Sequence, residues 1–412
     1  MRAPCKWVVG ILGLALLPMA PVGAQEVVKF GIMDAMTGRN AKVGQNIKRG
    51  AEMAAQRLNA RGGVLKRQVV LVVEDDKADP SAGVTAMEKL VTRERVHVVT
   101  GLYSTGVAYA ALNSLLRHPE KPVVVALGAI GMNIDQNFGK YDWFFHLASY
   151  ADDLQRQVAE FYGSLTPKPK RIALAADDSL VGQSVVASTR RFLKEAGFEL
   201  VADETFKAGA SDLTPVLTKI KAADPEIFHL VAYQSDLILA TKQMQELRFM
   251  PRLFGGPPAA ATASYLQAVG AAATEGVVAY TPYSLEVRFP ASKKYPALLP
   301  STEQWIADYK KAYGADPDPE SLWAYTVVVT TALAMEEAGS VETDKVIRAL
   351  ERLDVETPMG RLTWTPRSQT KHQGFHQGMI EQWQKGRLVV VYPGSLRTAP
   401  PLFPVPSWDA RK

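Results

Sequence analysis

Short apolar runs alternate with amphipathic segments along the first third of the chain. An apolar run at residues 27–32 precedes a segment whose apolar residues recur every three or four positions from Val43 to Leu58, and a glycine pair at 62–63 marks its end. Further apolar runs follow at 69–73, 96–100 and 123–127, with helical segments between them. Since strands buried on both faces form continuous apolar runs, this alternation predicts a mostly parallel sheet covered by helices.

A second series of the same kind begins after Trp143. We expect a helix from Asp152, a strand at 172–176, a helix ending before Gly197, and strands near 200, 228, 254 and 277. The last third differs, because helical segments at 302–313, 320–337 and 344–353 precede short β segments at 361–365, 379–383 and 388–392. The sequence therefore predicts an α/β protein with two Rossmann-like lobes, each built on a mostly parallel sheet.

The first 24 residues have the composition of a secretory signal peptide. Arg2 and Lys6 precede an uncharged apolar run at 8–17, and small residues end at Ala24, after which we expect cleavage. This run is too short for a transmembrane helix, which needs about twenty apolar residues. Cys5 is the only cysteine, so the exported chain would contain none. These features predict a periplasmic protein whose stability depends on buried apolar area rather than disulfides.

Length and charge narrow the class of protein further. A chain of 412 residues exceeds what one hydrophobic core usually supports, which also predicts two domains. The formal net charge of +5 falls to +3 when Arg2 and Lys6 leave with the signal peptide, and the other cations are scattered among carboxylates. A nucleic-acid-binding protein would concentrate its cations on one element, so we expect no nucleic-acid partner.

We find no motif for catalysis, a cofactor or a metal. The chain lacks a Gly-x-Ser-x-Gly elbow, a Gly-x-x-x-x-Gly-Lys-Ser/Thr loop and a His-Glu-x-x-His pair, and residues 128–131 match only half of a dinucleotide fingerprint. His372 and His376 are four positions apart, but Gly374 between them favours a strand or turn over the helix that a metal site would need. We therefore expect a protein that is not an enzyme and holds no cofactor.

The loops after predicted strands are the candidate ligand-binding regions, because open α/β sheets bind ligands at the carboxyl ends of their strands. Four such loops lie at 34–44, 102–106, 128–133 and 232–236. Ser104 and Thr105 could offer hydroxyls and helix amides to an anionic group, or simply cap a helix. Three tyrosines could line the site or merely pack in a core: Tyr103, Tyr150 and Tyr233.

Taken together, these segments resemble the leucine/isoleucine/valine-binding family of periplasmic receptors for ABC importers. The resemblance covers essentially the whole exported chain, and several spaced motifs carry it: residues 30–38, 58–64, 74–76 with 79–80, 86–90, 101–105, 275–277, 323–325 and 360–364. It implies a type I periplasmic binding protein fold, a small-molecule ligand, and a membrane permease and ATPase as partners of a monomer. A hinged closure would let those partners recognise the loaded form.

The resemblance also implies where the chain divides. Crossovers between the lobes are expected near 146–148, 280–282 and 355–359. The N-terminal lobe would then comprise 25–146 and 282–355, and the C-terminal lobe 147–281 and 356–393. Residues 394–412 are proline-rich and are expected to form an irregular tail.

Carried over residue by residue, the resemblance implies a site whose carboxylate-binding positions match the family and whose ammonium-binding positions largely do not. Family members hold a ligand carboxylate with a Ser or Thr after the third strand and with a backbone amide in the next loop. Ser104, Thr105 and Gly128 match these positions, and Ala129 continues the loop. The ligand ammonium is held by a threonine, a tyrosine and a glutamate, and the corresponding residues here are Ile130, Tyr233 and Pro257.

Two of the three ammonium partners are thus apolar, and a family tyrosine is also missing, since Val181 precedes Gly182. Burying an unpaired ammonium costs several kcal/mol, so we expect a ligand with an anionic or polar end and an apolar or aromatic body. Arg39 could bind such an acid, or could be an ordinary exposed loop residue. A receptor for a branched-chain or other amino acid, a ligand-sensing subunit of a signalling system, and a secreted enzyme on the same scaffold are the alternatives.

Overall fold

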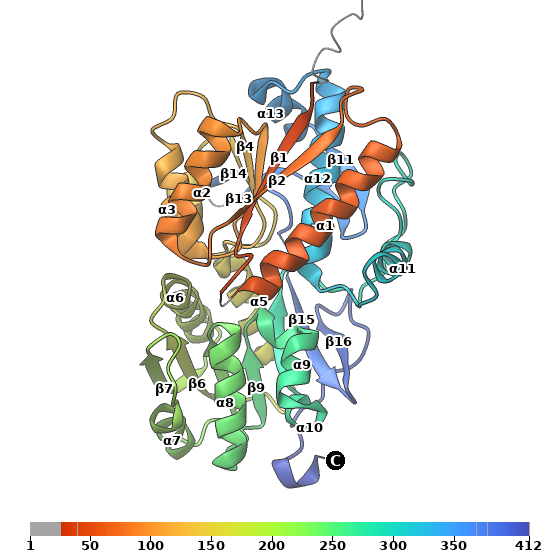
Figure 1. The fold of residues 1–412 in the computed structure, drawn as a ribbon. Helices are drawn as coiled ribbons and strands as arrows, with labels where there is room; N and C mark the ends of the chain where they lie inside the picture. Colours follow the sequence, from red (N-terminus) through yellow and green to blue (C-terminus); the bar gives the residue numbers. More distant parts are fainter. Residues whose placement is uncertain (1–25, 39, 368, 377, 412) are drawn as a thin grey trace, which may run out of the picture.

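Two seven-stranded sheets, one in each lobe, form the frame of the molecule (Figure 1). The computed structural model describes residues 26–411 apart from 39, 368 and 377, so the expected signal peptide and Arg39 lie outside the described residues. The strand orders are β13-β14-β5-β4-β3-β1-β2 and β16-β15-β10-β9-β8-β6-β7. Most neighbouring strands are parallel, which confirms the predicted fold class.

The first lobe is built from the N-terminal series together with most of the helical last third. Its strands are β1 (Val28–Asp34), β2 (Val69–Asp75), β3 (Val98–Gly101), β4 (Val123–Ala126), β5 (Phe144–His146), β13 (Thr365–Arg367) and β14 (Thr370–Gln373). Its helices are α1 (Ala41–Ala60), α2 (Pro80–Glu88), α3 (Thr105–Leu115), α4 (Met132–Phe138), α11 (Thr302–Tyr313), α12 (Pro319–Ala338) and α13 (Thr343–Glu351). A hairpin of β11 (Asp354–Thr357) and β12 (Gly360–Thr363) completes the lobe.

The second lobe repeats the βα alternation. Its strands are β6 (Arg171–Asp177), β7 (Glu199–Phe206), β8 (Ile227–Val231), β9 (Leu253–Gly256), β10 (Val278–Thr281), β15 (Met379–Gln384) and β16 (Arg387–Tyr392). Its helices are α5 (Ala151–Ser164), α6 (Leu180–Glu195), α7 (Thr214–Ala222), α8 (Gln234–Glu246), α9 (Ala263–Val269) and α10 (Ala271–Thr274). After Pro393 the described chain forms only a short 3-10 turn at Trp408–Ala410, and Trp408 donates to the Phe249 carbonyl at 2.9 Å.

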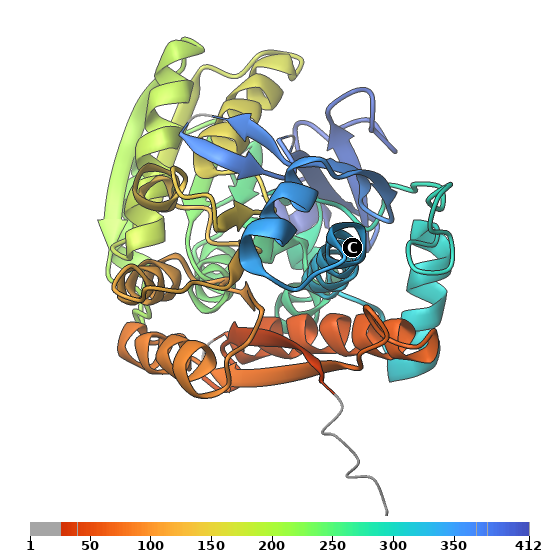
Figure 2. The ribbon, with the colours of Figure 1, turned by 90° about the horizontal axis from the view of Figure 1, so that it is seen from above.

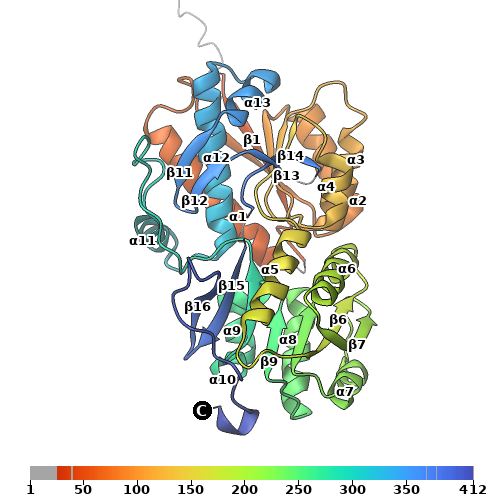
Figure 3. The same cartoon turned by 180° about the vertical axis from the view of Figure 1, so that it is seen from behind.

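The third crossover lies later than expected. The expectation that residues 356–373 belong to the second lobe is wrong, because β14 pairs with β5 and thus adds β13 and β14 to the first sheet. The reason is apolar packing: Leu362 and Trp364 are buried in the first-lobe core, where the Trp364 ring lies 5.2 Å from that of Phe145. After the third crossover, the chain therefore returns to the second sheet only at β15, which lies below the β11–β12 hairpin in Figure 3.

Helix α12 is buried along nearly its whole length and fixes one wall of the space between the lobes. Figure 2 looks down on the first lobe and shows α12 close to end-on beside α1. Gly50 of α1 permits this approach, since a Cβ there would lie 1.8 Å from the Ser321 carbonyl oxygen. Asn46 of α1 also donates to Asp318 at 2.9 Å, so two contacts set the start of α12. None of the described helices is both long and apolar enough to span a membrane.

Candidate functional site

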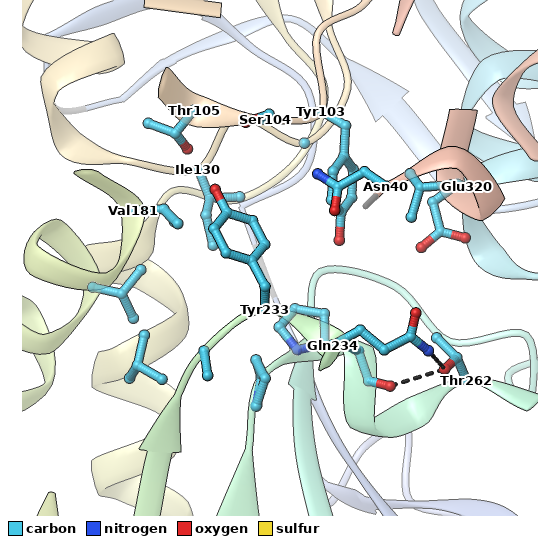
Figure 4. Close-up of a pocket in the computed structure, with 18 of the residues that line it drawn as sticks. Asn40, Tyr103, Ser104, Thr105, Ile130, Val181, Tyr233, Gln234, Thr262 and Glu320 are labelled. Atoms are coloured by element: carbon cyan, nitrogen blue, oxygen red, sulfur yellow. Dashed lines mark hydrogen bonds between the residues drawn. The ribbon is translucent and has the colours of Figure 1, made fainter. Parts of the chain in front are cut away.

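A cavity lies between the two lobes, where the carboxyl ends of the central strands of both sheets face each other (Figure 4). The space among its lining atoms, counted with the open mouth, is about 950 Å³, and residues of both lobes enclose it. The first lobe lines it with Asn40, Lys42, Val43, Tyr103, Ser104, Thr105, Gly128, Ile130, Glu320 and Trp323. The second lobe and its crossover line it with Asp177, Val181, Val185, Val231, Ala232, Tyr233, Gln234, Pro257, Pro258, Ala259, Thr262, Tyr280 and Pro282.

In the first lobe, Asp34 fixes the loop after β3, which contributes Tyr103 and Ser104 to the cavity wall. Its two carboxyl oxygens accept from the backbone amides of Ala35 at 2.9 Å and Tyr103 at 3.1 Å. Leu102 between the strand and Tyr103 has a φ of 56°, so this fixed backbone is strained as well as buried. Burial, together with the nearby Asp76 carboxylate, raises the pKa of Asp34 to about 8 despite those two amides.

The next residues open helix α3 toward the cavity. Ser104 is the N-cap residue, but its side chain makes no capping hydrogen bond, and the first turn of α3 contains no acidic residue. The Thr105 hydroxyl accepts from the Gly131 amide at 3.4 Å, which ties the next loop to this point. A helix N-terminus with free amides and an unused hydroxyl favours an anionic group.

The second lobe uses the same backbone arrangement but satisfies its own polar groups. Asp177 accepts from the backbone amides of Tyr233 at 3.3 Å and Ser179 at 3.0 Å. The side-chain nitrogen of Gln234 donates to the hydroxyls of Thr262 at 3.1 Å and Ser264 at 2.9 Å, so this donor is engaged within the lobe. Figure 4 draws the bond to Thr262, with the side-chain oxygen of Gln234 turned toward the cavity.

Apolar and aromatic groups cover most of the remaining cavity surface. Ile130 and Val181 are joined there by Val185, Val231 and three prolines. Among the tyrosines that line the cavity, burial raises the pKa of both Tyr103 and Tyr280, so these phenols stay neutral. Such a surface suits a ligand with an apolar or aromatic body.

Glu320 is the unexpected member of the site. It lies in the first turn of α12, is only 6 % exposed and lines the cavity. Burial and, to a smaller extent, the Asp318 carboxylate raise the pKa of Glu320 to about 7. The neighbouring Lys42 ammonium lies 3.8 Å from Asp318, so this cation already has a partner.

Most of the residues expected from the sequence meet at this cavity. Those that line it are Tyr103, Ser104, Thr105, Gly128, Ile130, Val181, Tyr233 and Pro257. Ala129 does not line it, because its methyl group is fully buried in the first-lobe core. Tyr150 lines a separate cavity with Asp135 and Gln373, since its ring stacks on His146 at 4.1 Å.

Sequence reasoning missed several lining residues, and those of the helical last third were missed because nothing connected that part of the chain with the cavity. Asn40 and Gln234 fall inside loops singled out from the sequence, whereas Glu320 and Trp323 lie at the start of a helix predicted without a role. The close approach of α1 and α12 at Gly50 places that helix start beside the loop at 34–44. This contact between distant segments has no signal in the sequence pattern and is visible only in the structure.

The described residues contain no group of three or more His, Cys, Asp or Glu that could hold a metal ion. His372 lies on β14, stacks on Phe145 at 4.1 Å and contacts the Glu351 carboxylate at 3.0 Å. His376 lies in the loop after β14 and contacts the hydroxyl of Thr365 on β13. Each histidine thus has its own structural partner.

Comparison with known proteins gives one consistent result. A family model described as periplasmic binding protein matches residues 27–387. Leu/Ile/Val-binding protein homolog 7 of Brucella suis is 28% identical over 394 residues, covering 93% of this chain and 95% of the relative.

Solved structures share the fold. The substrate-binding protein LivJ of Streptococcus pneumoniae, in complex with isoleucine, has a TM-score of 0.76 at 21% identity, covering 89% of this chain and 100% of the other. A solute-binding protein of R. palustris in complex with benzoate has a TM-score of 0.76 at 16% identity, covering 92% and 98%. The ligands of these two proteins differ, although their folds are equally similar to this one.

Proposed function

Because this chain belongs to the periplasmic binding protein family, we propose that it captures a small solute between its lobes for an ABC importer. A ligand that contacts both walls stabilises the closed form by its higher affinity for that form, and a permease with its ATPase can then recognise it. The proposal includes a periplasmic location, cleavage after Ala24 and a monomeric receptor. The cavity between the sheets and the roles for which the relatives are named support it.

The ligand we propose has a carboxylate at one end and an apolar or aromatic body. One observation carries this: the free N-terminus of α3, with Ser104 and Thr105, opens into a cavity whose other surfaces are mainly apolar and aromatic. Ile130 and Pro257 line that cavity and cannot bind an ammonium. The benzoate complex of the R. palustris protein supports the same class of ligand on this fold.

A receptor for an amino acid is the second candidate, and two observations favour it. The relatives are named for leucine, isoleucine and valine, and the LivJ structure holds isoleucine. Asp177 and Glu320 also line the cavity, and an ionised carboxylate could bind the ammonium of such a ligand.

A thermal-shift screen of refolded, ligand-free protein separates the two candidates. Aromatic and aliphatic monocarboxylates should raise the unfolding temperature more than leucine, isoleucine or valine does, since a ligand at about 100 times its Kd adds roughly 2.7 kcal/mol of stability. A larger shift with leucine or valine than with any monocarboxylate would select the amino-acid receptor. Turnover of a bound ligand would contradict the receptor function itself.

A further inference from the structure

Three buried polar atoms in the first-lobe wall of the cavity have no hydrogen-bond partner among the described residues. They are the Nδ2 of Asn40, the Nε1 of Trp323 and the Oε2 of Glu320. The three side chains are 9%, 4% and 6% exposed, and all three line the same cavity. The described residues include other buried polar atoms without a partner, but these three belong to side chains that line the cavity. An unpaired buried polar atom is costly, so a ligand that pairs with it gains affinity.

The fold holds these atoms in place rather than leaving them on a mobile loop. Asn40 occupies the N-cap position of α1 without a capping side-chain hydrogen bond, and Glu320 and Trp323 lie in the first turns of α12. The contact of Gly50 with the Ser321 backbone and the bond from Asn46 to Asp318 fix these two helix starts against each other. Figure 4 shows Glu320 and Thr105 on opposite sides of the cavity, with Tyr103 and Asn40 between them.

We propose that Asn40, Glu320 and Trp323 form a second polar subsite, which binds an uncharged group of the ligand that both accepts and donates hydrogen bonds. Two of the three atoms are N–H donors and need an acceptor, whereas Glu320 supplies a carboxyl oxygen. A hydroxyl or a primary amide satisfies all three. An ammonium satisfies only the glutamate, and it would leave both donors unpaired in a buried site.

This inference rests on the proposed function and extends it. The carboxylate of the ligand binds at Ser104 and Thr105, the apolar body lies against the aromatic walls, and a hydroxyl or amide at the far end reaches Glu320. The ligand class is therefore a hydroxy- or carbamoyl-substituted carboxylic acid rather than an unsubstituted acid or an α-amino acid.

Calorimetric titration of the ligand-free full chain with two matched series of acids tests the subsite. The aromatic series is benzoate, 4-hydroxybenzoate, 4-carbamoylbenzoate and 4-(aminomethyl)benzoate, and the aliphatic series is hexanoate, 6-hydroxyhexanoate and 6-aminohexanoate. In at least one series, the hydroxyl or amide probe should bind roughly tenfold more tightly than both the parent acid and the ammonium probe, as expected for paired buried hydrogen bonds.

Four variants separate an effect on the subsite from a general effect on ligand binding. Trp323→Phe removes only the indole N–H, and Glu320→Leu removes the carboxyl group, so each should reduce the preference to about twofold or less. Glu320→Gln keeps a group that both donates and accepts, and it should retain the preference within about threefold. Ser104→Ala is the matched control, because it should weaken all the probes alike.

The outcomes are distinguishable. If the parent acids bind but no probe is preferred, or if the ammonium probe binds most tightly, the subsite is wrong while the proposed carboxylate receptor stands. An equal preference in the wild type, Trp323→Phe and Glu320→Leu would also overturn it. If no acid of either series binds, the proposed ligand class itself fails. Trp323→Phe and Glu320→Gln are conservative, so the test does not depend on the folding of Glu320→Leu.

Discussion

The two lobes use the same arrangement to build their walls of the cavity, yet they leave different groups free. In each, an aspartate ends a central strand and accepts from a tyrosine amide after the neighbouring parallel strand: Asp34 from Tyr103 and Asp177 from Tyr233. In the first lobe, the following helix α3 has an unused N-cap side chain and no acidic residue in its first turn. In the second, the first turn of α8 contains Asp236, which accepts from the Gly209 amide.

This difference assigns different roles to the two walls. An anionic group gains most from a helix N-terminus that no carboxylate already neutralises, and only α3 fits this description of the two helices. The unpaired atoms of Asn40, Trp323 and Glu320 also lie in the first lobe. We infer that the first lobe supplies most of the polar contacts to the ligand, while the second lobe closes over its apolar body.

Replacing either aspartate with alanine tests the arrangement that the two lobes share, and it should have the largest effect of all on the free energy of unfolding. Asp34→Ala leaves the buried amides of Ala35 and Tyr103 unpaired, and Asp177→Ala does the same to Tyr233 and Ser179. Each should lower the free energy of unfolding by roughly 3 kcal/mol, measured by urea denaturation. If one of the two variants were as stable as the wild type, the stability of that lobe would not depend on these amide hydrogen bonds.

Asp34 should make the free energy of unfolding depend on pH. Burial raises the pKa of Asp34 from 3.8 to about 8, so the folded protein binds a proton that the unfolded chain releases above pH 4. Its contribution to stability is present at low pH and is lost as the pH rises toward 8. The free energy of unfolding should fall by about 2 kcal/mol between pH 5 and pH 7 from this group alone.

Asp34→Asn removes the titrating group, so its stability should vary less over this range than that of the wild type, although it starts lower because one oxygen acceptor is lost. Asp177→Asn is the matched variant, because it replaces the strand-end carboxylate of the second lobe and leaves Asp34 in place, so the fall in stability assigned to Asp34 should persist in it. Parallel curves for the wild type and Asp34→Asn would show that Asp34 does not titrate between pH 5 and pH 7.

The repeated βα series was readable from the sequence, because buried strands and amphipathic helices have distinct periods. The loops after β3 and β4 could be placed at the carboxyl edge of the first sheet, and the loop after β8 at that of the second, which is why Ser104, Gly128 and Tyr233 were found. Strand direction sets each of these positions, whereas the facing of the two edges was implied by the family resemblance.

Contacts between distant segments could not be read in the same way. The β13–β14 hairpin is composed of short polar strands, so its place in the first lobe follows from contacts with distant segments: the pairing of β14 with β5 and the burial of Trp364 against Phe145. Glu320 lies in a helix buried on all sides, where periodicity does not indicate which end meets a cavity. Tyr150 follows the crossover directly, and stacking on His146 rather than sequence position decides where its ring lies.

Two of the N-cap serines, one in each lobe, allow a finer comparison of binding with stability. Ser179 caps α6 by accepting from the Gly182 amide at 3.1 Å, so Ser179→Ala should cost about 1 kcal/mol of stability and change the Kd for a bound monocarboxylate by less than about twofold. Ser104 makes no such bond, so Ser104→Ala should cost less than about 0.5 kcal/mol but weaken that binding by roughly fivefold. Denaturation and calorimetry on both variants give the two values, and the reverse assignment would contradict the carboxylate position.

The smallest expected effect concerns two tyrosines that the sequence did not separate. Tyr103→Phe removes a hydroxyl that points into the cavity, and should weaken binding of the same monocarboxylate by about threefold (Figure 4). Tyr150→Phe keeps the ring that stacks on His146 in the separate cavity, so the Kd should stay within about twofold. A greater loss of affinity in Tyr150→Phe than in Tyr103→Phe would mean that the crossover next to β5 couples to ligand binding, and that the first-lobe wall does not act alone.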